Sequence, residues 1–179
     1  MSTRLIHRSA ARPNRMISET VALLFTAELI APGNRLMIVT PWISDVPILD
    51  NRCGGLSSLE PSWASTTIRL SKVLRVLLQK DVSVQISCGP GIREDNFLGV
   101  IKEMAGRDGS LDSLTIRRAS ADRYSEFDHE KAVIADNWAV FGSMNLTYRG
   151  VELNGELVTV TRDLQKVAEV ATALSGLFQ

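Results

Sequence analysis

Apolar residues in the segment 16–31 recur at the spacing of one helix face, and Pro32 and Gly33 end the pattern. The apolar positions on that face are Val21, Leu24, Phe25 and Leu29. The run LMIVT at 36–40 follows directly and is short, apolar and β-prone, which is typical of a buried strand. The start of the chain is therefore predicted to form a core helix followed by an internal strand.

The alternation between helical and strand patterns continues to the end of the chain. Helices are predicted at 66–80, 93–105 and 163–178, and strands at 82–87, 114–118, 130–135, 138–141 and 156–161. Asp136 and Asn137 stand between two of these strands and are a hairpin signal. The polar segments 46–66 and 119–127 are predicted to be a long loop and a linker. This order favours an α/β fold, with a mixed sheet flanked by helices on both faces.

The N-terminal segment 1–15 is basic and contains no acidic residue. Its arginines are Arg4, Arg8, Arg12 and Arg15. Two interpretations are open: a frayed, solvated tail, which we prefer, or an arm that contacts phosphates. A cleaved signal peptide is a third, but Glu19 and Glu28 bracket an apolar run too short to span a bilayer. We expect a basic arm at 1–15 and one domain at 16–179.

The composition is that of an ordinary globular protein and does not indicate a particular activity. The 179 residues are 45% hydrophobic and 22% charged. Twenty basic and twenty acidic side chains cancel, so any attraction to phosphate must come from a local cluster. Cys53 and Cys88 lie far apart without CxxC spacing, which argues against a disulfide framework or zinc cluster. A reducing, cytoplasmic compartment fits this cysteine usage.

The stretch DHEKAVIADNWAVFGSMNLT at 128–147 holds the residues with the clearest chemistry. On a strand, His129 and Lys131 share a face about 6–7 Å apart along the backbone. A histidine can act as nucleophile or general acid, and a neighbouring lysine can hold an anion. Asp136 would lie on the opposite face roughly 23 Å from His129, so we assign it to the hairpin turn.

The hairpin returns Gly142, Ser143 and Asn145 to the neighbourhood of His129. The glycine allows close backbone approach, the serine is a good N-cap for a following helical turn, and the asparagine adds a hydrogen bond to phosphate. Glu156 is the predicted acceptor that orients His129, with Glu152 as the alternative. Taken singly, each feature has an ordinary structural explanation, namely a packed histidine or a common turn and cap.

Taken together, these residues resemble the signature of the phospholipase D superfamily, HxKx4D followed by x6GSxN. His129, Lys131 and Asp136 match the first part, and the Gly-Ser-x-Asn at 142–145 matches the second. The gap after Asp136 is five residues instead of six, which fits a tighter hairpin turn. The order of elements from residue 16 onwards is also similar to one catalytic half of that family, although only the motif region is specific.

The resemblance implies phosphodiester chemistry without metal or cofactor, in which one motif histidine attacks phosphorus and a second protonates the leaving oxygen. This chain has one motif, and His7 does not match it, so the resemblance implies a homodimer that builds one site from two subunits. No metal motif such as HExxH is present. The acidic residues around the motif are explained more simply by a solvated loop. They are Asp122, Glu126, Asp128 and Glu130.

Small single-motif members of the family resemble bacterial nucleases, some of them in DNA-modification or phage-defence systems, so DNA is the preferred substrate. Trp42 in PWISD follows a strand at the expected cleft and could stack on a base or simply pack under the loop. Arg93 and the segment 46–66 are further candidates for substrate contact. The alternatives are a catalytically silent member that binds nucleic acid or assembles a complex, and a phospholipase. No stable membrane association is expected.

Overall fold

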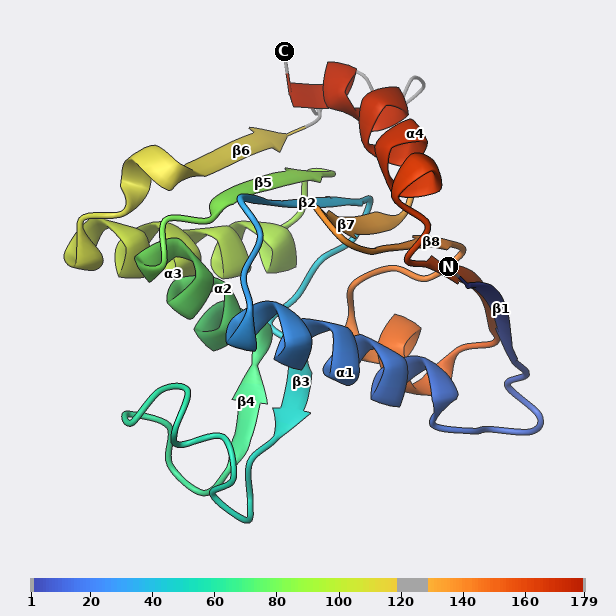
Figure 1. Cartoon of the computed structure of the whole chain (residues 1–179), viewed down its shortest axis with the longest axis horizontal. Helices are drawn as coiled ribbons and strands as arrows, with labels where there is room; N and C mark the ends of the chain where they lie inside the picture. Colours follow the sequence, from blue (N-terminus) through green and yellow to red (C-terminus); the bar gives the residue numbers. More distant parts are fainter. Residues whose placement is uncertain (1, 119–128, 179) are drawn as a thin grey trace.

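The computed structural model of the chain describes residues 2–118 and 129–178, and within these a mixed sheet forms the centre of the fold. Figure 1 shows this sheet, whose strands lie in the order β1-β9-β8-β7-β2-β5-β6. These strands are β1 (Thr3–Arg8), β2 (Arg35–Thr40), β5 (Ser83–Cys88), β6 (Leu114–Arg118), β7 (Ala132–Ala135), β8 (Ala139–Gly142) and β9 (Glu156–Thr161). The strands β2, β5 and β6 are parallel, and the other pairs are antiparallel.

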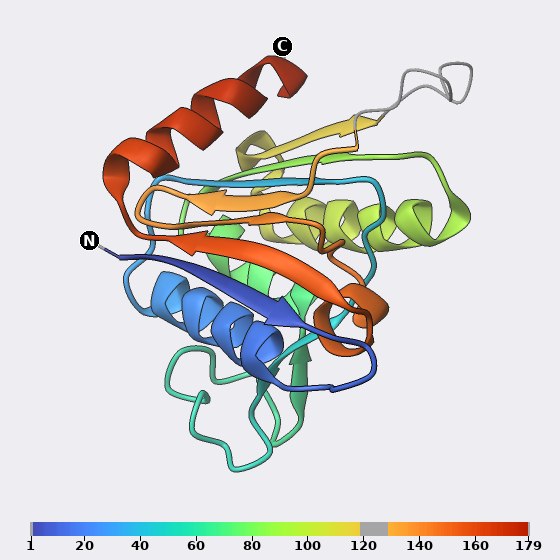
Figure 2. The same ribbon diagram turned by 90° about the vertical axis from the view of Figure 1, so that its right-hand side faces the viewer.

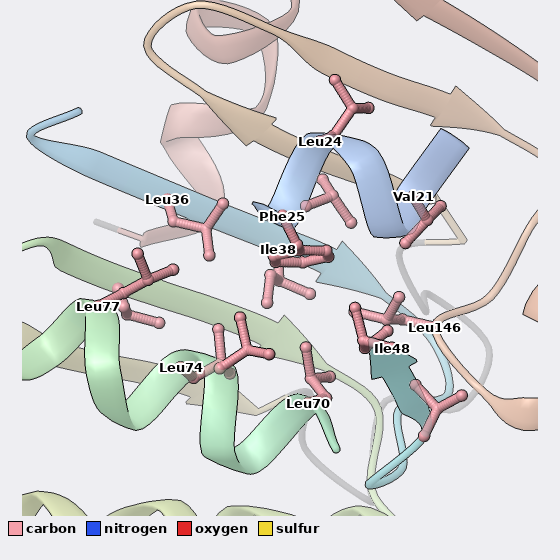
Figure 3. Packing of buried hydrophobic residues seen from close by; sticks show 14 of the residues in the cluster. Val21, Leu24, Phe25, Leu36, Ile38, Ile48, Leu70, Leu74, Leu77 and Leu146 are labelled. Carbon is pink, nitrogen blue, oxygen red and sulfur yellow. The ribbon is translucent and has the colours of Figure 1, made fainter. Parts of the chain in front are cut away.

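Helices cover both faces of the sheet, as predicted (Figure 2). One face carries α1 (Met16–Ile30), α2 (Leu70–Gln79) and α3 (Ile92–Asp108), and the other carries α4 (Leu164–Ser175). Ile38 of β2 packs with Phe25 and Leu74 in the larger core (Figure 3). The adjacent Met37 points the other way and packs in a smaller cluster with Val167 of α4. Alternation along β2 therefore supplies both cores, and the predicted α/β fold is confirmed.

Two segments that were not predicted as strands contain short strands. Residues 3–8 form the edge strand β1 instead of a frayed tail, because β9 offers them a paired partner from Glu156 to Thr161. The expected loop 46–66 contains β3 (Pro47–Asp50), which pairs with β4 (Thr67–Arg69) and delays the start of α2 to Leu70. The predicted linker at 119–127 lies outside the described residues.

The segment between β3 and β4 is organised by one buried asparagine. Asn51 Nδ2 donates to the backbone oxygen of Ala64 at 3.0 Å, and Asn51 Oδ1 accepts from the amide of Leu56 at 2.7 Å. Trp63 is buried in the larger core, which fastens the far side of the segment. The apparent loop is therefore an ordered excursion held by its own polar and apolar contacts.

The turn of the β7–β8 hairpin is fastened to the end of α1 by a buried carboxylate. Glu28 accepts from Trp138 Nε1 at 2.9 Å and from the amide of Gly33 at 2.7 Å. The Trp138 ring also meets Phe25 edge to face, with ring centroids 5.8 Å apart. These contacts hold the hairpin against the helix layer, which fixes where its two open ends lie.

Candidate active site

Segments that are far apart in the sequence meet where the central strands of the sheet end. Strand β7 runs antiparallel to β2, so the start of β7 lies beside the C-terminal end of β2. Strand β8 ends at the same end of the sheet and β9 begins there, because β7, β8 and β9 pair antiparallel with one another in turn. This topology gathers residues 129–131, 142–145 and 156 near Trp42, which follows β2.

His129 and Lys131 are in contact at this end of the sheet. Lys131 Nζ lies 2.9 Å from His129 Nδ1 and 3.4 Å from Nε2, and it donates to the backbone oxygen of His129 at 2.7 Å. His129 is exposed and precedes β7, which begins at Ala132 and not at residue 130 as predicted. The amide of Gly142 still donates to the oxygen of Lys131 at 3.1 Å, so backbone pairing extends to the lysine.

Lys131 is the buried cation of the cluster, with 8% of its surface exposed. Burial lowers the pKa of its ammonium group, and the carboxylates of Glu156 and Glu130 oppose that shift. A cation held in this way has lost much of its hydration and regains stabilisation when an anion arrives. The position suits a phosphoryl oxygen bound next to the His129 ring.

Ser143 and Glu156 form a hydrogen bond that the sequence did not reveal. Ser143 Oγ donates to Glu156 Oε2 and accepts from the amide of Leu157 at 3.0 Å. The amide of Ser143 donates to the oxygen of Leu157 at 3.1 Å. The prediction of Ser143 as a helix N-cap is therefore wrong, because pairing with β9 occupies both groups. The next helical residues belong to the π-helical turn η3 (Arg149–Leu153).

The predicted orienting contact between Glu156 and His129 is not formed within the described structure. Glu156 is buried and accepts a hydrogen bond from Ser143, while the His129 ring contacts Lys131. The alternative acceptor, Glu152, lies in η3. Glu156 nevertheless acts electrostatically on Lys131, because its carboxylate raises the pKa that burial lowers.

Gly142 is required by the backbone at the end of β8. Its φ is +148°, and a Cβ there would meet the backbone oxygen of Leu157 at a distance no real side chain allows. The absence of a side chain lets β8 and β9 approach while the chain turns into Ser143. Gly142 therefore allows the close approach of β8 and β9, and its predicted role in substrate binding stays a prediction.

Asn145 is held by a threonine that sequence analysis did not single out. Thr40 Oγ1 lies 3.2 Å from Asn145 Oδ1 and 3.0 Å from the backbone oxygen of Trp42. On the other side, a Cβ at Gly150 would collide with the backbone oxygen of Asn145. Thr40 ends an apolar strand, and a polar residue at that point was the available signal.

Trp42 lies directly beside the histidine. The Trp42 and His129 rings meet edge to face, with centroids 5.8 Å apart and an interplanar angle of 87°. Trp42 is 50% exposed, so the packed-under-the-loop interpretation is wrong. Trp42, Arg93 and Asn145 line one cleft with a volume of about 390 Å³. The structure thus brings Trp42 and Arg93 to the same cleft, whereas Gly142 and the segment 46–66 do not line it.

Asp136 lies in the turn at the other end of β7. Its Oδ2 accepts from the amide of Asn34 at 2.6 Å and from Asn34 Nδ2 at 3.3 Å. The side chain therefore ties the β7–β8 turn to the connection between α1 and β2. Within the motif, Asp136 fastens the hairpin, and the other matched residues gather at the opposite end.

Arg8 is a structural residue of the site region that sequence analysis placed in a solvated arm. It is fully buried, and its guanidinium donates to the backbone oxygens of Asn154, Val151 and Gly150 at 2.7, 2.5 and 2.5 Å. These carbonyls belong to η3 and the residue that follows it. Arg8 therefore holds the turn that carries one wall of the cleft, and it is not placed to contact phosphate.

The described residues were also compared with what a membrane span, a metal site or a disulfide requires. Residues 2–118 and 129–178 contain no helix long and apolar enough to cross a membrane. In the same ranges, no group of three histidine, cysteine or acidic side chains is arranged to hold a metal ion. Cys53 and Cys88 are both free thiols, and burial raises the pKa of Cys88 to about 11.

A match to a family model of sequences identifies the family. The sequence model described as "Cardiolipin synthase, PLD-like domain" matches residues 62–178, which is well over half of the chain. The chain therefore belongs to the phospholipase D-like family, and the predicted membership is confirmed. A comparison with curated protein sequences finds no match.

Solved structures of the same fold differ widely in sequence. Nuc from Salmonella typhimurium, a phospholipase D family member, is 14% identical with a TM-score of 0.60, covering 98% of this chain and 93% of Nuc. NucT from Helicobacter pylori is 12% identical with a TM-score of 0.55, and the coverage is 98% and 94%. Phosphatidylserine synthase from Haemophilus influenzae is 16% identical with a TM-score of 0.63, but only 38% of its chain is covered, against 97% of this one.

Proposed function

We propose that the protein is a phosphodiester hydrolase that cleaves DNA without a metal ion, through a covalent intermediate on His129. One observation carries the proposal: an exposed histidine contacts a buried lysine, and its ring meets Trp42, which lines a cleft together with Asn145. A nucleophile, a desolvated cation and an amide around one point are what phosphoryl transfer requires. Membership in the phospholipase D-like family supports the same reaction class.

In the proposed reaction, a ring nitrogen of His129 attacks phosphorus and the bond to the leaving oxygen breaks. Lys131 and Asn145 bind the phosphoryl oxygens, while the Ser143 hydroxyl donates its proton to Glu156 and so fixes that carboxylate. Water then attacks phosphorus and gives a proton to the group that protonated the leaving oxygen, the nitrogen–phosphorus bond breaks, and His129 is restored. Glu156 holds Ser143 and balances the charge of Lys131.

The leaving oxygen needs a proton from a second group at the moment of bond cleavage. The described part of the chain carries one other histidine, His7, on the edge strand β1 opposite Leu157. The proposed donor is instead His129 of a second copy, placed opposite by a two-fold axis. Mixing excess His129→Ala subunits with wild type should then lower the activity per wild-type subunit. Unchanged activity per wild-type subunit would contradict a shared site.

DNA is the proposed substrate because of what surrounds the histidine. Trp42 presents half of its surface beside His129, and Arg93 lines the same cleft, a combination suited to bases and phosphates. A structure of TrmBL2, an archaeal chromatin protein described as showing a novel mode of DNA binding, shares the fold at 13% identity and a TM-score of 0.52. The match covers 98% of this chain and 51% of TrmBL2, so a domain of this fold occurs within a DNA-binding protein.

A second candidate function is binding without cleavage, as a nucleic-acid-binding or assembly component. The observation that favours it is the engagement of Glu156 with Ser143, which leaves the His129 ring turned toward Lys131. In that case the same cleft would bind nucleic acid, and no phosphodiester would be cut.

One assay separates these functions. Purified protein is incubated in EDTA with plasmid, single-stranded DNA, RNA and phosphatidylcholine vesicles, with His129→Ala as the control. The proposal expects cleavage of DNA by the wild type and none by the variant, which should keep its fold. Activity that requires magnesium would contradict the mechanism. Hydrolysis confined to phosphatidylcholine would contradict the substrate, and binding without cleavage would support the second candidate.

A further inference from the structure

Two clefts join at Tyr148, and the first of them extends to Trp42, whose ring meets His129. The first, of about 390 Å³, is the one lined by Trp42 and Asn145. The second, of about 540 Å³, lies between the segment 44–47 and the first half of α3. Ser44, Arg93 and Tyr148 line both, so the two form one continuous depression. Each volume lies within the range of about 300–1,000 Å³ that is typical of ligand sites.

The exposed charges of the joined clefts are basic. Arg93 and Arg149 line the first cleft and Arg69 lines the second, and all three side chains are exposed. Arg69 Nη1 donates to the backbone oxygen of Asp45 at 2.5 Å, which leaves its remaining donors directed elsewhere. Three guanidinium groups along one depression form the local cationic track that a chain of zero net charge otherwise lacks.

The two acidic residues of the clefts have their charge offset locally. Asp45 accepts from the amide of Ser71 at 2.8 Å and from its hydroxyl at 3.0 Å, in the first turn of α2. Glu94 is buried, with 5% exposed, in the first turn of α3. The positive end of a helix stabilises a carboxylate in both places. The arginines therefore set the sign of the surface that a ligand meets.

Aromatic faces complete the lining. Tyr148 is 51% exposed at the junction of the clefts, and Trp42 is 50% exposed at the end nearest His129. Exposed aromatic rings between arginines are the arrangement that binds unpaired nucleotides, because every base has a face that can stack. In a duplex the bases already stack on each other, and only their edges remain accessible.

We propose that the joined clefts bind an unpaired stretch of nucleic acid next to the phosphate to be cut, with a base stacked on Tyr148 and phosphates held by Arg93 and Arg149. The direction of the strand, leading to His129, rests on the proposed function. The binding itself does not, because it depends on residues outside the motif.

Fluorescence polarisation tests the stacking contact. The His129→Ala protein is titrated in EDTA with a short labelled oligothymidylate, with an abasic strand of equal length, and with a duplex. Adding Tyr148→Ala should weaken oligothymidylate binding about tenfold and leave abasic binding unchanged. Tyr148→Phe should keep the affinity, because the ring remains.

The arginines are tested through salt. Arg149→Ala or Arg93→Ala should weaken both single strands and reduce the slope of log K against log salt by about 0.7. Arg107→Ala is the matched control, since Arg107 is 67% exposed at the opposite end of α3 from Arg93. It should change neither affinity nor slope.

The proposal is overturned if Tyr148→Ala leaves oligothymidylate binding unchanged, if it weakens abasic binding equally, or if the duplex depends on Tyr148 as strongly. Failure of the proposed function looks different. A wild type that shows Tyr148-dependent binding but cuts nothing contradicts only the hydrolase. One that cuts DNA while strand binding ignores Tyr148 contradicts only the stacking site.

Discussion

The ammonium nitrogen of Lys131 lies 2.9 Å from Nδ1 of His129, and it donates to the backbone oxygen of the same residue at 2.7 Å. The lysine therefore holds its neighbour from two sides while remaining largely buried. An incoming phosphoryl oxygen would replace the ring as the partner of the cation, which would release His129 for attack. In the proposed mechanism, this exchange would couple anion binding to the release of the nucleophile.

Replacing Lys131 by alanine should lower kcat for DNA cleavage about 100-fold. The substitution removes a donor directed at charge that develops on phosphorus in the transition state. Steady-state kinetics in EDTA provide the measurement, and Lys102→Ala, an exposed lysine of α3, provides the control. Retention of wild-type kcat by Lys131→Ala would show that the cation plays no part in the chemistry.

Lys131→Met should be more stable than the wild type at neutral pH. Burial lowers the pKa of Lys131 below its ordinary 10.5, so between the two values the unfolded chain binds more protons and wild-type stability rises with pH. The advantage of Lys131→Met should therefore shrink as pH approaches 10.5. Urea unfolding of both proteins at neutral pH and near pH 10 measures the difference. A less stable variant at neutral pH would contradict the expected penalty.

Asp136→Ala should cost stability and leave the specific activity of the folded protein unchanged. The variant loses the acceptor for the Asn34 amide at 2.6 Å, an interaction worth about 2 kcal/mol. Denaturant unfolding and activity per folded molecule are the two measurements. Asp136→Asn keeps an acceptor oxygen and should retain more stability. A stable but inactive Asp136→Ala would mean that this carboxylate acts in the reaction.

Arg8→Ala should destabilise the fold by about 3 kcal/mol. It removes a fully buried guanidinium and leaves the oxygens of Gly150, Val151 and Asn154 without their donor. Arg4→Ala, on the same strand but exposed, should change stability by less than about 0.5 kcal/mol. If the two substitutions lowered the melting temperature equally, Arg8 would be an exposed residue, as its sequence context indicated.

The local sequence pattern predicted those helices and strands whose periodicity or turn residues lie within the element itself. Helix α1 shows its periodicity in one run, and the β7–β8 hairpin carries its own turn residues, so both followed from sequence. Strand β1 did not, because its partner is β9 and Arg8 pairs with Glu156, far away in the chain. Nothing local distinguishes a buried arginine from a solvated one.

The candidate site divides in the same way. Spacing along a strand placed His129 beside Lys131 and Asp136 in the turn, because these are short-range relations. The hydrogen bond from Ser143 to Glu156 depends on the register of β8 against β9, and the local sequence pattern does not indicate that register. The sequence did not indicate the exposed position of Tyr148 either, because that position depends on how Arg8 holds the adjacent turn η3.

The most direct test of the central claim is to trap the covalent intermediate. Wild-type protein is mixed with DNA in EDTA, quenched rapidly without acid, digested and examined by peptide mass spectrometry. The account predicts a nucleotide linked through phosphorus to the peptide that contains His129, and no such adduct in His129→Ala. Efficient DNA cleavage without an adduct, or an adduct on another residue, would contradict it.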